Sequence, residues 1–315
     1  MIHAMSSQEL ISVLLFLLAI LTICGLEIAI LVRSIGNRLR GLFARKILFA
    51  KPSIVVHGIA LSIFACLLYA YFIEPYWIDV HSATLRTARL KSDSFRIVQI
   101  SDLHCDRTAR NEERVVQIIN SLKPDIVVAT GDYLNDLAGL PRLRQMLSRL
   151  EAPLGKFAVT GNFEALHWPN VDVLADSGFR VLERETVVVT QGADALAITG
   201  MGFVRSDSPR EPLEGFSEDR YDVFLFHTPD LVEDFAHRGI DLYLCGHTHG
   251  GQVRLPWYGA LVTLSNFGKK YESGLYRVGD TVLYVNRGLG LEPRPAPQVR
   301  FLARPEIAVF DILPE

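Results

Sequence analysis

The sequence lacks a disulfide framework and a block of basic residues. Only four of its 315 residues are cysteines, too few and too irregularly spaced for a disulfide-rich scaffold. We therefore expect Cys105 and Cys245 to be free thiols. Residues 81–315 hold 26 basic and 31 acidic residues. An acidic domain without a basic patch argues against nucleic acid as the main partner.

The chain also lacks Lys and Arg before Leu10, which argues against a secretory signal peptide. Two long apolar runs follow instead, at residues 10–32 and 54–73. Each is long enough to cross a bilayer as a helix. The sequence therefore predicts a membrane anchor in residues 1–80 and one globular domain in residues 81–315.

The charges between the two runs predict an orientation. This loop contains no acid, and its basic residues are Arg33, Arg38, Arg40, Arg45, Lys46 and Lys51. By the positive-inside rule the loop is cytoplasmic and the domain lies outside the cytoplasm. Three basic residues after the second run, at 86, 89 and 91, weaken this prediction. A hairpin that enters the membrane without crossing it stays an alternative. Glu27 and His57 either pair within the hairpin or reach the headgroup layer.

In the globular domain, short apolar runs are followed at once by polar clusters. "FRIVQI" precedes "SDLHCD", "DIVVAT" precedes "GDY" and "IDLYLC" precedes "GHTHGG". Such runs predict buried strands, and helical patterns separate several of them, as in "NEERVVQIINSL", "LPRLRQMLSRL" and "TPDLVEDFAHRG". Strands that alternate with helices indicate an α/β fold. From Thr186 onward, runs such as "TVVVT", "ALAIT" and "LVTL" favour a second sheet.

Polar side chains that follow these strands form one candidate site. They are Asp102, His104, Asp132, Asn162, His227, His247 and His249. Functional groups at the carboxyl ends of strands in an open α/β sheet converge on one rim. Carboxylate, imidazole and amide ligands without a thiolate suit Mn, Fe or Zn ions. If two ions share so few ligands, one carboxylate must bridge them.

These motifs resemble the calcineurin-like metallophosphoesterases, over essentially all of residues 94–312. The resemblance is strongest to a bacterial membrane-linked branch, through "GHTHGGQ", "GLY", "RGLG" and "RPEI". It implies a four-layer α/β/β/α sandwich preceded by two transmembrane helices, in the bacterial inner membrane. It also implies two divalent ions, Mn first and Fe or Zn as alternatives.

The resemblance assigns roles to the seven residues. The first ion would be held by Asp102, His104, Asp132 and His249. The second would be held by Asp132, Asn162, His227 and His247, with Asp132 bridging. A hydroxide between two such ions attacks phosphorus in line with the leaving oxygen. Asp132, Asn162 and His249 would thus also serve catalysis.

The sequence departs from the family at "GNFE", where the family reads Gly-Asn-His followed by an acid. The His helps to protonate the leaving oxygen, and Phe163 cannot. A phosphate leaving group, with a second pKa near 6, departs without that help. Phe163 therefore favours a pyrophosphate bond as the bond that is cleaved. The sequence is similar to the UDP-2,3-diacylglucosamine pyrophosphatases of lipid A synthesis, which cleave such a bond. That step is cytoplasmic, which conflicts with the orientation from the loop charges.

Other readings remain open. His167 could serve as the proton donor in place of the missing histidine if its side chain reaches the cleft. In that case the protein would be a broad-specificity phosphodiesterase or phosphatase of the cell envelope. A metal-binding membrane scaffold without activity is a third reading, which the complete ligand set disfavours. Arg107, Arg205 and Arg287 are candidates for gripping a substrate phosphate. The expected partners are a phosphorylated, lipid-linked small molecule and the membrane.

Overall fold

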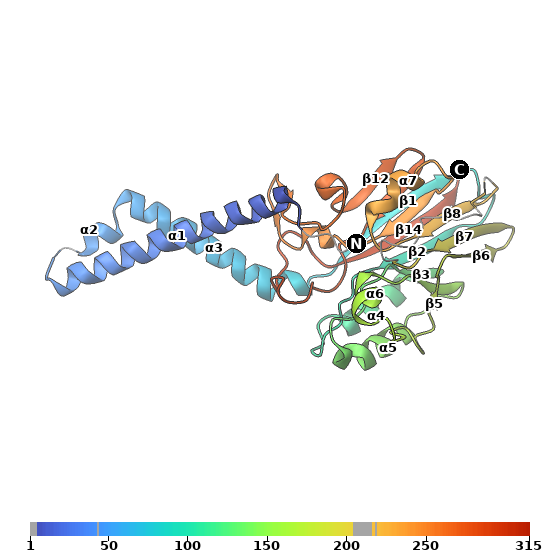
Figure 1. Ribbon diagram of the computed structural model, residues 1–315, viewed down its shortest axis with the longest axis horizontal. Helices are drawn as coiled ribbons and strands as arrows, with labels where there is room; N and C mark the ends of the chain where they lie inside the picture. Colours follow the sequence, from blue (N-terminus) through green and yellow to red (C-terminus); the bar gives the residue numbers. More distant parts are fainter. Residues whose placement is uncertain (1–4, 43, 204–215, 218) are drawn as a thin grey trace. The chain divides into compact units, whose positions relative to one another are not determined.

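The computed structural model describes residues 5–42, 44–203, 216–217 and 219–315 (Figure 1). The described chain divides into two compact units, residues 5–73 and 74–315. The sequence predicts a boundary after residue 80, whereas the second unit begins earlier. The reason is that the short helix η1 (Glu74–Tyr76) and the strand β1 (Asp79–Thr87) belong to it.

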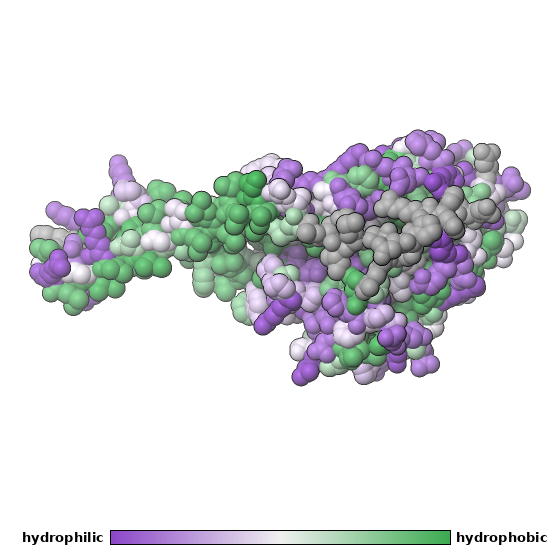
Figure 2. Space-filling model, in the orientation of Figure 1, coloured by the Kyte–Doolittle hydropathy of each residue, from purple (hydrophilic) through white to green (hydrophobic). Residues whose placement is uncertain are grey.

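The N-terminal unit is a helical hairpin. It contains α1 (Ser7–Leu39), α2 (Ala44–Leu48) and α3 (Lys51–Phe72). Two helices of the described chain, at 7–39 and 51–76, are long and apolar enough to cross a membrane, and their surface is largely hydrophobic (Figure 2). His57 Nδ1 lies 2.7 Å from Glu27 Oε2, so these two residues, one from each long apolar helix, form a pair.

The first sheet of the second unit has the order β1-β14-β2-β3-β4-β5. Besides β1, its strands are β14 (Glu306–Pro314), β2 (Phe95–Ile100), β3 (Ile126–Ala129), β4 (Gly155–Ala158) and β5 (Arg180–Val181). Strands β2 to β5 run parallel, and β14 lies antiparallel to β2 and parallel to β1. Both faces of β2 are buried, which explains its continuous apolar sequence.

The second sheet has the order β12-β13-β9-β8-β7-β6. Its strands are β6 (Glu185–Gln191), β7 (Asp194–Gly200), β8 (Tyr221–Leu225), β9 (Leu242–Cys245), β12 (Gly274–Val278) and β13 (Thr281–Val285). Four of them, β7, β8, β9 and β13, are parallel neighbours. The run "LVTL" at 261–264 forms no strand, and only the short pair β10 (Arg254–Leu255) and β11 (Gly259–Ala260) lies beside it.

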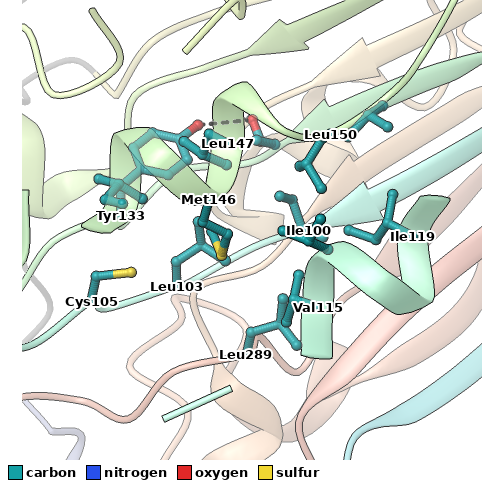
Figure 3. Packing of buried hydrophobic residues seen from close by; sticks show 14 of the residues in the cluster. Ile100, Leu103, Cys105, Val115, Ile119, Tyr133, Met146, Leu147, Leu150 and Leu289 are labelled. Atoms are coloured by element: carbon teal, nitrogen blue, oxygen red, sulfur yellow. Dashed lines mark hydrogen bonds between the residues drawn. The ribbon is translucent and has the colours of Figure 1, made fainter. Parts of the chain in front are cut away.

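Three hydrophobic clusters define four layers. The first lies between β2, β3 and the helices α4 (Glu112–Leu122) and α5 (Leu140–Ser148), where Ile100 and Ile119 are fully buried (Figure 3). The second fills the space between the two sheets, with Ile97 and Leu244. The third packs the outer face of the second sheet against η3 (Pro229–Leu231) and α7 (Val232–Phe235). The domain is therefore an α/β/β/α sandwich.

The outer helical layer over the second sheet is thinner than the sequence predicts. The pattern at 228–239 indicates a continuous helix, but the chain forms only η3 and α7 before it turns. Thr228 caps this segment, because its hydroxyl accepts a hydrogen bond from Asp230 N.

The four cysteines carry free thiols, as the sequence predicts for Cys105 and Cys245. These two are buried, and burial raises the pKa of both thiols.

Candidate metal centre

The seven candidate ligands lie at the ends of five strands. Asp102 and His104 follow β2, and Asp132 follows β3. Asn162 begins α6 (Asn162–His167) after β4, and His227 follows β8. His247 and His249 follow β9. The two sheets therefore bring these residues to one edge of the sandwich, as the strand-end pattern predicts.

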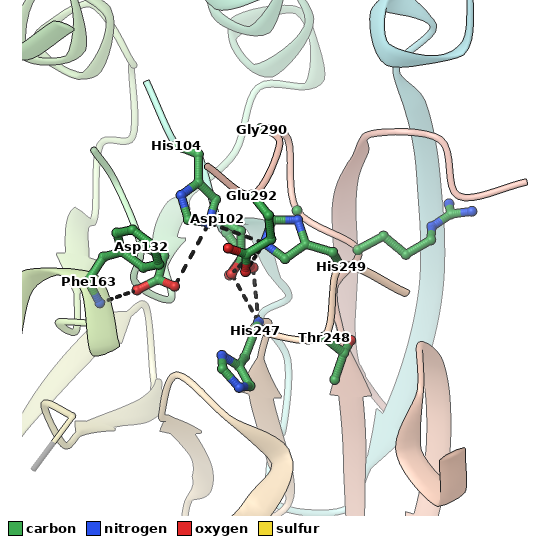
Figure 4. A network of polar contacts seen from close by, with 12 residues as sticks. Asp102, His104, Asp132, Phe163, His247, Thr248, His249, Gly290 and Glu292 are labelled. Carbon is green, nitrogen blue, oxygen red and sulfur yellow. Dashed lines mark hydrogen bonds and ion pairs between the residues drawn. The ribbon is translucent and has the colours of Figure 1, made fainter. Parts of the chain in front are cut away.

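The first group of potential metal ligands consists of Asp102, His104 and His249, all of them buried. His104 Nε2 lies 3.1 Å from His249 Nε2, and His249 Nε2 lies 3.6 Å from Asp102 Oδ1. These donor atoms face one another (Figure 4). Two imidazole nitrogens at this distance can share one proton or hold one cation between them.

The second group consists of Asp132, His227 and His247. His227 Nε2 lies 3.1 Å from Asp132 Oδ2 and 3.2 Å from His247 Nδ1. Asn162 joins this group, since its Oδ1 lies 2.8 Å from His227 Nε2. The residues that the resemblance assigns to a second ion are thus gathered around one imidazole nitrogen.

Asp132 connects the two groups. Its Oδ2 is buried, lies 3.1 Å from His227 Nε2 and 3.9 Å from His104 Nε2, and accepts no hydrogen bond from a described residue. Its Oδ1 accepts a hydrogen bond from Phe163 N at 2.8 Å. A buried carboxylate oxygen without a donor is costly unless a cation takes that place. The donor set therefore fits divalent metal ions, with Asp132 between them.

Hydrogen bonds on the far side of the rings orient the imidazoles. His104 Nδ1 lies 2.6 Å from Asn135 Oδ1, and His227 Nδ1 lies 2.7 Å from Thr130 O. His247 Nε2 lies 3.1 Å from Leu264 O. In each pair the oxygen accepts, so the ring nitrogen that faces it donates, and the other ring nitrogen is the one directed at the candidate ligands.

Burial also prepares the site for a cation. It lowers the pKa of His104 and of His249, and together with the charge of His227 it lowers the pKa of His247 to about 4. These three rings are therefore neutral at pH 7, as ligation requires. Burial opposes charge on Asp132 too, but the attraction of His227 lowers the pKa of Asp132 to about 2.

The backbone at the ligands is unusual. Five of the seven have a positive φ: Asp102 (48°), His104 (41°), Asp132 (56°), His247 (71°) and His249 (51°). Few residues other than glycine adopt this conformation, and it is concentrated at functional sites. Glycine is required beside them, because a Cβ on Gly246 would lie 2.1 Å from Asp102 Oδ2 and one on Gly161 would lie 2.2 Å from Asp132 Oδ1.

The sequence motifs do not indicate several residues that support the candidate ligands. Glu164 is buried and accepts hydrogen bonds from the backbone N–H groups of Asp132, Tyr133 and Gly161. It therefore holds the "GDY" turn against α6. The acid after the family's histidine position is the signal that could have identified it. The other supporting residues are Asn135, Glu292 and Arg300.

The structure separates the candidate substrate-binding residues. The guanidinium of Arg287 donates hydrogen bonds to Glu306 and to Asp79, so it is not available to bind a substrate phosphate. The Arg107 side chain is 80% exposed and lies 3.9 Å from Asp136, so it is free to move toward a ligand. Arg205 lies outside the described residues.

His167 is exposed at the end of α6. The ring of Phe163 lies 4.9 Å from that of His167 and 4.9 Å, edge-on, from that of His104. Phe163 thus occupies the position next to the first group of ligands, and His167 contacts the ring that fills it.

Comparisons with known proteins agree with this geometry. Residues 95–251 match the family described as calcineurin-like phosphoesterase. The chain is 34% identical over 262 residues to the uncharacterized metallophosphoesterase YkuE of Bacillus subtilis, which covers 78% of this chain and 88% of the relative.

Two relatives have more specific names. The UDP-2,3-diacylglucosamine pyrophosphatase LpxG of Chlamydia trachomatis is 28% identical over 283 residues, covering 70% of this chain and 84% of the relative. The phosphodiesterase YaeI of Escherichia coli is 27% identical over 255 residues, covering 78% and 92%. Taken with the site, the two sheets and the family match, these similarities show that the chain is a hydrolase of the calcineurin-like metallophosphoesterase family.

Proposed function

We propose that this chain is a membrane-anchored phosphohydrolase that cleaves a pyrophosphate bond in a lipid-linked substrate of the UDP-2,3-diacylglucosamine type. The observation that carries the proposal is Phe163 beside an intact donor set. A proton donor at this position is worth about 10²–10⁴-fold for a poor leaving group. An enzyme without it is suited to a leaving group that departs as a stable anion, such as a phosphate with its second pKa near 6.

The ligand roles follow from the two groups of donors. Asp102, His104 and His249 would hold one divalent ion, and Asn162, His227 and His247 the other, with Asp132 shared. Two such ions supply an activated water and neutralise charge on the phosphoryl group. Nitrogen and oxygen donors without a thiolate suit Mn, with Fe or Zn as alternatives. Asp132 Oδ1 is held by Phe163 N, which leaves Oδ2 directed at both groups.

Two further observations support a substrate with an apolar part. The ring of Phe163 contacts His104, and the ring of Phe203 lies 6.2 Å from that of His227, so an aromatic side chain borders each group of ligands. The apolar helices α1 and α3 would hold the domain at a bilayer, where a diacylated substrate resides. The relative LpxG, named as a UDP-2,3-diacylglucosamine pyrophosphatase, favours the same substrate class.

A second candidate is an envelope phosphodiesterase. The basic loop between α1 and α3 favours a domain outside the cytoplasm, and the relative YaeI is named a phosphodiesterase. In that case Arg107, which is exposed, would bind the phosphate, and His167 would donate the proton.

A substrate assay tests the two candidates. The full chain, purified in detergent and loaded with Mn, is offered UDP-2,3-diacylglucosamine and, separately, an aryl phosphodiester. The proposal expects release of UMP from the first and slower turnover of the second. Turnover of the diester alone would favour the second candidate, and Asp132→Asn is the inactive control for both.

A topology assay addresses the membrane side independently. A reporter that is active only outside the cytoplasm is fused after residue 315, and a cytoplasmic reporter is fused at the same point in a second strain. The pyrophosphatase of lipid A synthesis requires the cytoplasmic result. A clear signal from the external reporter would remove that role and leave the envelope enzyme.

A further inference from the structure

Glu292 is an acidic side chain at the metal centre that lies outside the seven candidate ligands. It follows the strand β13 and the motif "RGLG". Its Oε1 lies 3.4 Å from His249 Nε2, and its side chain is only 20% exposed. Figure 4 shows it beside His249. The carboxylate therefore reaches the nitrogen with which His249 would bind a metal.

The backbone around Glu292 is held in place by residues that also serve the ligands. Glu292 N donates to Gln252 Oε1 at 2.9 Å, and Gln252 directly follows the "GHTHGG" turn that carries His249. On the other side, Asn135 Nδ2 donates to Leu291 O at 3.1 Å, and the same Asn135 orients His104. The position of Glu292 is thus tied to both imidazoles of the first group.

Among the described residues, only His249 lies within ion-pair distance of the Glu292 carboxylate. The nearby guanidinium of Arg300 is occupied by the backbone carbonyls of Gly288, Gly290 and Ala303. Buried charges are normally paired or bind a metal, so a third carboxylate, in addition to those of Asp102 and Asp132, calls for a cation in the site.

The distances fit a shared ion. Two donor atoms at roughly 2.1 Å from one ion and at right angles lie about 3 Å apart. His249 Nε2 lies 3.1 Å from His104 Nε2, 3.4 Å from Glu292 Oε1 and 3.6 Å from Asp102 Oδ1. Glu292 therefore stands in the same relation to His249 as the two residues already assigned to this ion.

We propose that Glu292 is an additional carboxylate ligand of the ion held by Asp102, His104 and His249. This inference rests on the proposed two-metal function and adds a negative charge to one half of the site. The two halves then differ in character, because the other half takes Asn162, a neutral amide, where the first takes Glu292. The half with two unshared carboxylates retains its ion more strongly.

Metal titration of the full chain in detergent tests the assignment without turnover. The metal-stripped protein is titrated with Mn²⁺ by calorimetry, and the bound ions are followed by electron paramagnetic resonance. Wild type is expected to bind two ions with different affinities. Glu292→Gln and Glu292→Ala should each weaken the tighter site by at least about tenfold and leave the other site unchanged. Glu183→Gln is the matched control, because Glu183 contacts Thr160 and no ligand.

The outcomes separate this inference from the proposed function. Two unchanged affinities in both Glu292 variants, with normal unfolding temperatures, would overturn the ligand role even if the substrate is cleaved. An equal loss in Glu183→Gln would also overturn it. If wild type binds two ions and Glu292→Gln loses the tighter one, but no substrate turns over, the ligand role stands and the proposed function fails.

Discussion

The backbone N–H of Phe163 donates a hydrogen bond to Asp132 Oδ1 at 2.8 Å. This position therefore has two separable functions. The backbone aligns the carboxylate that lies between the two groups of ligands, and any side chain preserves that contact. The side chain decides whether a proton donor stands next to His104. Phenylalanine removes the donor while the ligand geometry is kept.

Phe163→His restores a proton donor without disturbing Asp132. We expect hydrolysis of an alkyl phosphodiester to rise by about 10²–10⁴-fold in kcat/KM, while cleavage of a pyrophosphate changes little. Parallel assays on both substrates measure the ratio. Phe163→Leu, which adds no donor, is the control and should leave the ratio as in wild type. An equal rise on both substrates would contradict the leaving-group argument.

Asp132→Asn removes the negative charge between the two groups. Because Asp132 Oδ2 has no hydrogen-bond donor and faces both His104 and His227, we expect the variant to lose coupled binding of two ions. Activity should fall by at least the 10–100-fold seen when a residue that only supports a ligand is lost. Metal content by mass spectrometry and kcat/KM measure the two effects. Full metal content with full activity would exclude the bridging role.

Asn135→Leu tests the orientation of His104. The variant keeps the approximate side-chain volume but removes the acceptor 2.6 Å from His104 Nδ1. We expect metal affinity to fall by about 10–100-fold. Asn135→Asp retains an acceptor and should bind more tightly than the leucine variant. Identical affinities for both variants would show that the contact does not position the ring.

Metal removal should destabilise the domain, because the buried carboxylates of Asp102 and Asp132 then repel each other without a cation. At a metal concentration of about 100 times Kd, the folded state gains about 2.7 kcal/mol, which corresponds to a rise in Tm of roughly 5–10 °C. Thermal unfolding with chelator and with Mn measures the shift. Asp132→Asn should show a smaller shift, and no shift in wild type would argue against a metal centre.

Asp241 gives a pH dependence away from the site. Burial raises its pKa to about 6, against the opposing hydrogen bond from Asp222 N and the charge of Arg89. The folded state therefore holds a proton that the unfolded state releases near pH 4, so stability falls as pH rises from about 4 to about 6. The shift corresponds to up to about 3 kcal/mol.

Asp241→Asn should remove this fall, as measured by denaturant unfolding at pH 4 and pH 7. Asp194→Asn is the control of opposite sign. Backbone hydrogen bonds from Asp93, Ser92 and Lys91 lower the pKa of Asp194, so that its stabilisation is present at neutral pH and is lost on acidification. A parallel pH response in the two variants would refute the assignment for Asp241.

The sequence predicts most of the strands, and the structure gathers the candidate ligands at one edge as expected, because both features depend on local patterns. An apolar run buried on both faces and a polar cluster directly after it are both visible in "FRIVQI" and "SDLHCD". The contacts of single side chains are a different matter. Arg287 follows a strand like the ligands do, yet Asp79 and Glu306 hold its guanidinium. That arrangement depends on a strand 208 residues away in the chain.

Glu292 is the opposite case, a residue at the candidate metal centre that the sequence motifs do not indicate. Nothing in "GLGLEPRP" marks it as a residue of the metal centre, because its position is set by Gln252 and Asn135, which are remote in sequence. Positive φ values at five ligands are likewise invisible in the residue types. Only the neighbouring glycines at 131, 161 and 246 hint that the backbone there approaches other groups closely.

The place of β14 in the first sheet has a consequence for biosynthesis. β14 lies between β1 and β2, so these two strands, which are made early, have no direct pairing to form when they leave the ribosome. One edge of β1 and one edge of β2 stay unpaired until residues 306–314 have been synthesised. Until then β2 exposes an unpaired apolar edge, which favours aggregation during folding. We infer that the nascent domain depends on its last strand to close the first sheet. A truncation or a bulky fusion that hinders β14 would therefore impair the yield of folded protein more than its catalytic chemistry.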